Sequence, residues 1–102
     1  MTIYTVIWST AGQDDDCNSK AFCGVHKMYT SLENAKKGLE ECKEDFLNEL
    51  IYNLDFDEEE KEFAKENTHV YGSVEDQYFE IDYILGDVTC EAYLKIVVDE
   101  IV

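Results

Sequence analysis

The stretch that decides the fold is 78-YFEIDYILGDVTCEAYLKIVV-98, in which apolar side chains occupy every second position on both sides of a Gly86-Asp87 pair. Such alternation is typical of strands that have one buried face. A two-residue turn that begins with glycine, between two such runs, predicts a type II′ β-hairpin. We expect its buried face to be formed by Phe79, Ile81, Tyr83, Leu85, Val88, Cys90, Ala92, Leu94, Ile96 and Val98.

The other face of this hairpin is polar. In the simplest register, Asp82 lies opposite Glu91, and like charges directly opposed across a sheet are destabilising. Tyrosine is favoured in protein interfaces, and carboxylates there usually need basic partners. The face is therefore either a plain solvated surface or a partner-binding surface. The latter would consist of Tyr78 opposite Lys95, Glu80 opposite Tyr93, and Asp82 opposite Glu91.

The first part of the chain predicts further strands. Residues Ile3 to Trp8 are β-branched or aromatic on both faces, which is typical of an interior strand. The polar run 11–19 predicts a loop before a second strand over 21–29, so these two strands should form a hairpin. A further strand is expected from His69 to Val74.

Between these strands the apolar residues recur at intervals of three and four, which predicts an amphipathic helix. Thr30 and Glu33 have the spacing of a capping box at its start, and the helix could run to about Leu54. Its apolar series is Leu32, Ala35, Leu39, Cys42, Phe46 and Leu50.

Asp57 and Glu60 repeat the capping-box spacing and predict a short second helix through about Glu66. No repeat, linker or low-complexity segment interrupts the chain. We therefore expect residues 1–102 to form a single α+β domain, an antiparallel sheet of four to five strands packed against one long amphipathic helix, plus a short second helix.

The charge of the chain restricts its partners. With 24 acidic and 8 basic residues the net charge is −16, which repels nucleic acid and anionic membranes and attracts basic protein surfaces. The content of 45% hydrophobic residues exceeds that of a disordered acidic tail. No leader segment and no apolar run of about 18 residues is seen, so we expect a cytoplasmic protein without membrane contact.

The acidic run within 53-NLDFDEEEKEF-63 allows three interpretations. As a calcium loop it places carboxylates at the first, third, fifth and twelfth positions, but Glu60 stands where a glycine is required. As a helix N-terminus it needs no ligand, because carboxylates in a first turn interact favourably with the helix dipole. As a partner-binding patch it would use Asp55, Asp57, Glu58, Glu59, Glu60 and Glu62.

The cysteines and histidines do not form a recognisable site. Two disulfides would require a secreted protein, and a zinc site from Cys17, Cys23 and His26 lacks the usual close cysteine spacing. We expect no metal and no cofactor, and we expect Cys23, Cys42 and Cys90 to be buried free thiols.

No pattern in the sequence indicates a catalytic residue. The chain has two histidines, His26 and His69, and lacks a phosphate-binding glycine loop, a nucleophile elbow and a paired-cysteine motif. Each histidine is interpreted as a strand residue near a carboxylate rather than as a base. We therefore predict that the protein is not an enzyme.

The carboxylate spacing suggests mimicry of nucleic acid. Carboxylates two apart on a strand stand about 6.6–6.8 Å apart, and four apart on a helix about 6 Å, which resembles the separation of phosphates along a strand. Glu80 and Asp82 form such a strand pair. Glu41, Asp45 and Glu49 form such a helical row.

The segment Ile3 to Trp8, followed by 29-YTSLENA-35, resembles small acidic bacteriophage accessory proteins, including anti-CRISPR and anti-restriction proteins. The resemblance implies a non-enzymatic inhibitor that occupies the basic channel of a host nucleic-acid-binding effector, such as a CRISPR–Cas complex, without binding nucleic acid itself. The resemblance does not assign any site residue to this chain. A regulatory or structural interaction module is the alternative, a metal-binding protein or small enzyme is the third, and homodimer formation stays open.

Overall fold

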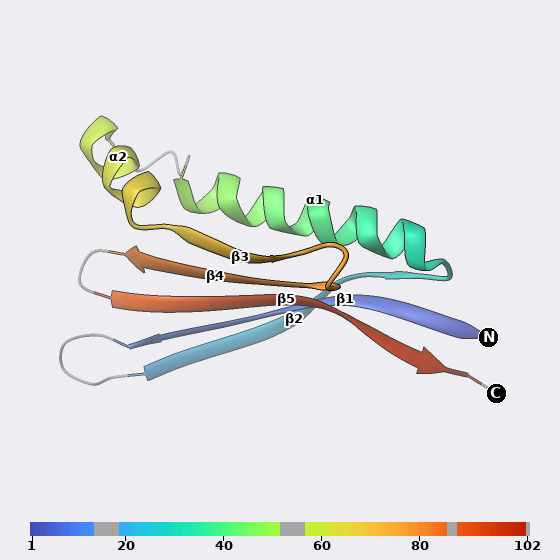
Figure 1. Cartoon of the computed structure of the whole chain (residues 1–102). Helices are drawn as coiled ribbons and strands as arrows, with labels where there is room; N and C mark the ends of the chain where they lie inside the picture. The colour runs from blue at the N-terminus through green and yellow to red at the C-terminus, as the bar shows by residue number, and fades with distance from the viewer. Residues whose placement is uncertain (14–18, 52–56, 86–87, 102) are drawn as a thin grey trace.

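The computed structural model describes residues 1–13, 19–51, 57–85 and 88–101. Its elements, in chain order, are β1 (Thr2–Gln13), β2 (Ser19–Tyr29), α1 (Leu32–Ile51), α2 (Glu58–Glu66), β3 (His69–Ser73), β4 (Tyr78–Leu85) and β5 (Val88–Glu100). The strands form one antiparallel sheet, and both helices lie on the same side of it (Figure 1). The predicted α+β fold, with a long and a short helix, is confirmed.

The strand order is β2-β1-β5-β4-β3, so the last strand in sequence is the central one. β1 pairs with β5 from Thr2 opposite Glu100 to Gln13 opposite Thr89, which makes β1 an interior strand as predicted. The predicted loop over 11–19 begins too early, because β1 continues to Gln13 along the length of β5. The register of the β4–β5 hairpin is confirmed, whereas its Gly86-Asp87 turn lies outside the described residues.

The core lies between the sheet and α1. Leu39 of α1 is fully buried, as are Val6 of β1, Ile81 of β4 and Leu94 of β5. Alternate residues of β4 from Phe79 to Tyr83 and of β5 from Val88 to Ile96 point into this layer, which confirms the predicted buried face for these residues. Val98 is 51% exposed, because β5 diverges from α1 toward the C-terminus (Figure 1). The Leu85 side chain is not among those described.

The start of α1 differs from the prediction, whereas the start of α2 agrees with it. The Ser31 hydroxyl, not that of Thr30, accepts a hydrogen bond from the Asn34 N–H at 3.2 Å, so the predicted capping box of α1 is wrong by one residue. The predicted cap of α2 is correct, because the Asp57 carboxylate accepts from the Glu60 N–H at 2.8 Å. Leu54 lies outside the described residues.

The predicted burial of the cysteines is correct for two of three. Cys42 and Cys90 are buried free thiols, whereas Cys23 is exposed. The Cys23 prediction is wrong because β2 is an edge strand, and Cys23 lies opposite Ser9 on the side of the sheet away from α1. Cys17 lies outside the described residues. No helix in the described part of the chain is long and apolar enough to cross a membrane.

Candidate partner-binding surface

None of the described helices and strands covers the side of the sheet opposite α1, and we call it the open side (Figure 1). On β4 and β5 the residues that alternate with the core point to this side. The structure brings together there all five residues that the sequence predicts for the hairpin. We call this set the tyrosine–carboxylate face, and it consists of Tyr78, Glu80, Asp82, Glu91 and Tyr93.

The two tyrosines hold two of the carboxylates. The Tyr93 hydroxyl donates to Glu91 Oε2 at 2.8 Å, and the Tyr78 hydroxyl lies 3.4 Å from Glu80 Oε1. The two rings stack with their centroids 6.3 Å apart and an interplanar angle of 29°. Each bond uses one carboxylate oxygen, so the remaining lone pairs are available to donors of a partner, on side chains that are already oriented.

The opposed pair of the face is costly to the free protein. Asp82 and Glu91 are directly opposite in the register, as the sequence predicts, and like charges in this arrangement repel. Asp82 Oδ1 is in addition buried and accepts no hydrogen bond within the described part of the molecule. A buried acceptor without a donor costs about 1–3 kcal/mol. A cationic side chain placed between Asp82 and Glu91 would relieve both costs.

The pKa values of both tyrosines of the face are raised above the ordinary phenol value. The hydrogen bond to Glu91 is the largest of the causes that raise the pKa of Tyr93 above the ordinary phenol value. Partial burial, followed by the charge of Glu80, raises the pKa of Tyr78. Both phenols therefore remain neutral hydrogen-bond donors over the physiological pH range, and the negative charge of the face resides on its carboxylates.

β3 adds two residues that the sequence analysis does not assign to the site. His69 lies opposite Asp82, and Tyr71, which is 52% exposed, lies opposite Glu80. The predicted strand over 69–74 contains both residues, but its pairing with β4 has no local signal in the sequence. The interpretation of His69 as a strand residue near a carboxylate is correct.

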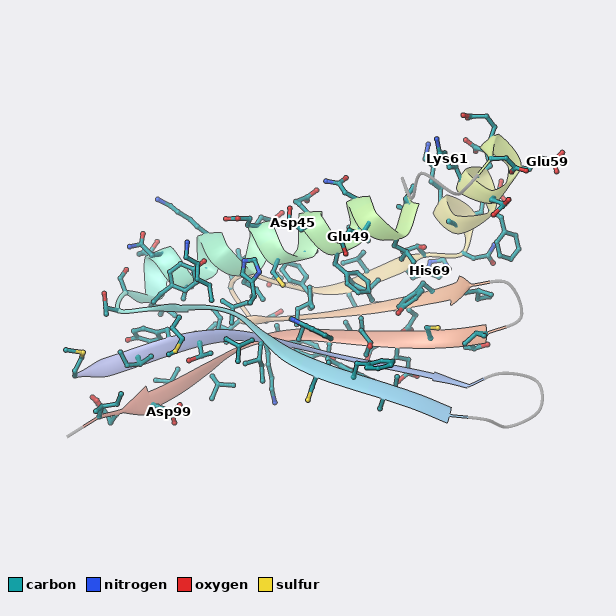
Figure 2. The ribbon with its side chains drawn as sticks, turned by 180° about the vertical axis from the view of Figure 1, so that it is seen from behind. Asp45, Glu49, Glu59, Lys61, His69 and Asp99 are labelled. Carbon is teal, nitrogen blue, oxygen red and sulfur yellow. The ribbon has the colours of Figure 1, made fainter. Side chains whose placement is uncertain are left out.

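The acidic residues of α2 lie elsewhere. Glu58, Glu59, Glu60 and Glu62 are exposed on α2, and Figure 2 shows Glu59 on the helix side of the sheet, away from the open side. Glu58 pairs with Lys61 and Glu62 with Lys65, each at 3.8 Å. Because residues 58–66 are helical, the calcium-loop frame does not form. Asp55 lies outside the described residues.

The predicted partner-binding residues thus form two separate groups. Asp57 serves as the helix cap, and the first-turn carboxylates of α2 have the favourable position that helix ends give to negative charge. In the tyrosine–carboxylate face, by contrast, Asp82 and Glu91 are directly opposed like charges, which are expected to act against stability. Of the two groups, the face is therefore the better candidate surface.

On β1 and β2 the open side has a different composition. Neither strand contains an aspartate or glutamate. Val25 and Met28 of β2, which pair with Ile7 and Thr5, are 61% and 60% exposed on this side. The charge of the open side is thus concentrated on β4 and β5.

The described residues contain no group of three or more histidine, cysteine or carboxylate side chains arranged to hold a metal ion. No protein-family model, no curated protein and no solved structure matches the chain.

Proposed function

We propose that this chain is a non-enzymatic inhibitor that docks its tyrosine–carboxylate face on the basic, nucleic-acid-binding surface of another protein. The observation that carries the proposal is the direct opposition of Asp82 and Glu91, with Asp82 Oδ1 buried and unpaired within the described structure. A folded surface that keeps repelling carboxylates between stacked tyrosines is suited to a cationic partner.

Mimicry of nucleic acid accounts for the spacing of the charges. Glu80 and Asp82 are two apart on one strand, which separates them by about 6.6–6.8 Å, close to successive phosphates. The stacked rings of Tyr78 and Tyr93 supply flat apolar surface beside them, as bases do beside phosphates. The target that fits is a channel whose lysines and arginines otherwise bind phosphates, and the resemblance to phage anti-defence proteins implies that the channel belongs to a host defence effector.

The α2 carboxylates contribute differently in this proposal. They lie on the other side of the sheet, so a partner docked on the face does not cover them. Their charge attracts a basic partner over roughly a Debye length, which raises the association rate more than the affinity.

The test is capture of a target from bacterial lysate on the immobilised protein, in about 0.15 M and about 0.5 M salt. We expect a basic protein that is retained at low salt, lost at high salt and released by short duplex DNA or RNA. Asp82→Asn/Glu91→Gln should abolish capture. Glu58→Gln/Glu59→Gln, which removes the same number of charges from α2, should retain most of it.

Two outcomes would contradict the proposal. Equal loss of capture in both double variants would mean that net charge, not the face, attracts the target. Retention of the target at high salt, with no release by nucleic acid, would favour an interaction module that binds through exposed apolar residues such as Val25 and Met28.

A further inference from the structure

A β-bulge redirects one side chain of β2. Val6 pairs with Lys27 and Ile7 with Val25, so His26 is an extra residue between two regular stretches of the ladder. Bulges re-aim side chains and are over-represented beside functional sites. Here the extra residue lies on the side of the sheet that faces α1, together with Trp8 and Thr10 of β1.

His26 lines a cavity of about 420 Å³ between α1 and the β1–β2 hairpin. Its walls include the apolar side chains of Trp8, Phe46 and Leu94 and the carboxylates of Asp45 and Glu49. This volume falls within the range of about 300–1,000 Å³ that is typical of small-molecule sites. The cavity lies on the opposite side of the sheet from the tyrosine–carboxylate face and is independent of the function proposed above.

One nitrogen of the His26 imidazole is unpaired among the described residues. This atom, Nε2, is buried and makes no hydrogen bond within the described part of the chain. Buried polar atoms are nearly always paired, and an exception calls for a structural or functional cause. A ligand in the cavity that donates to His26 Nε2 would satisfy it.

The two carboxylates of the cavity also differ from Glu40 and Glu44 of the same helix. Glu40 and Glu44 of α1 both contact the Lys43 ammonium, at 2.7 and 3.3 Å. Asp45 and Glu49, one helical turn apart on α1 (Figure 2), form no ion pair among the described residues. They place negative charge beside an aromatic wall, with no group of ligands that would hold a metal ion in the described structure.

We propose that this cavity binds an organic cation. The ligand is an amidinium, guanidinium or ammonium group on a flat or aliphatic body. Its charge lies at Asp45 and Glu49, its body packs between Trp8 and Phe46, and one N–H donates to His26 Nε2. The tautomer of neutral imidazole that accepts at Nε2 is the one with its proton on Nδ1. The same chemistry is offered by a free amine and by an arginine side chain of a protein.

Trp8 is the single tryptophan of the chain, so its fluorescence reports directly on this cavity. The probes are benzamidine and benzamide, which have nearly the same shape and differ in charge. We expect saturable binding of benzamidine and at least tenfold weaker binding of benzamide. Equal binding of the two probes, or no binding of benzamidine, would overturn the proposal.

Matched variants separate the cavity from the general negative charge. Asp45→Asn and Glu49→Gln should each weaken benzamidine binding severalfold. Glu33→Gln, in the first turn of α1, removes one charge from the same helix but not from the cavity, and it should leave the affinity unchanged. A loss in Glu33→Gln as large as that in Asp45→Asn would indicate nonspecific attraction and contradict the proposal.

His26→Leu tests the unpaired nitrogen. We expect weaker benzamidine binding and no decrease in Tm, because the variant removes an unsatisfied polar atom and keeps apolar bulk. Unchanged affinity would contradict the role of His26. With the parent protein, a blocked arginine peptide that binds as well as benzamidine would identify a protein side chain as the ligand, and a peptide that binds at least tenfold more weakly would identify a free amine.

Discussion

The two hairpins of the sheet are alike on the side that α1 covers and different on the open side. Val6 of β1 and Ile81 of β4 are both fully buried in the same core. On the open side, β4 and β5 carry Glu80, Asp82 and Glu91, whereas β1 and β2 carry no carboxylate. Exposure of a sheet to water therefore does not by itself require acidic residues in this protein. The carboxylates of β4 and β5 call for a separate explanation, and a basic partner supplies it.

Truncation of a core side chain is expected to give the largest effect, and it tests whether both hairpins share one core. Ile81→Ala should lower the free energy of unfolding by about 2–5 kcal/mol, because it leaves a cavity against α1. Val6→Ala should lower it by a smaller amount of the same sign, since it removes fewer buried atoms. Urea denaturation measures both. A neutral result for either variant would mean that its hairpin does not share the core.

The next effect concerns the pH dependence of the buried side. Burial is the main cause that raises the pKa of the Tyr83 phenol from 10.0 to about 12 and that of the Cys42 thiol from 9.0 to about 11. Both groups are neutral in the fold and ionise more readily in the unfolded chain. Their contribution to stability is therefore complete below pH 9 and is lost progressively as the pH rises toward 12.

Thermal denaturation at increasing pH tests this expectation. The Tm should be constant from neutral pH to about 9 and should then decrease. In Cys42→Ala the decrease should be smaller, because one of the buried groups that ionise in this range is absent. A Tm that stays constant above pH 11 would show that neither group is shielded from water.

A smaller effect tests the hydrogen bonds of the open side. Glu91→Gln removes the charged acceptor of the Tyr93 hydroxyl, so the pKa of Tyr93 should move down toward the ordinary phenol value. Titration by the ultraviolet absorbance of tyrosinate measures this change. Glu100→Gln, at the far end of β5, is the control and should leave the curve unaltered. An unaltered curve for Glu91→Gln as well would mean that Tyr93 and Glu91 are not bonded in solution.

The parts of the fold that the sequence predicts are those with local signals. The register that opposes Asp82 to Glu91 follows from a two-residue turn, and the α2 cap follows from the spacing of Asp57 and Glu60. The pairing of β1 with β5 joins Thr2 to Glu100, and no local pattern encodes a contact across almost the whole chain. Strand order was therefore not predicted.

The surface features that the sequence did not predict have the same origin. The exposure of Cys23 depends on β2 being an edge strand. The addition of Tyr71 to the open side depends on the register of β3, and the cavity depends on a one-residue bulge at His26. Each of these features is set by long-range pairing, which alternation along one strand cannot specify.

Asp82 and Glu91 are kept together at a cost to the free protein, and this cost can be measured. A double-mutant cycle of Asp82→Asn and Glu91→Gln, measured by urea denaturation, tests it without knowledge of the partner. We predict a repulsive coupling of about 0.2–1 kcal/mol, with the double variant more stable than the parent. A parent more stable than every variant in the cycle would show that the two carboxylates stabilise the fold, and would contradict the claim that they are retained for binding.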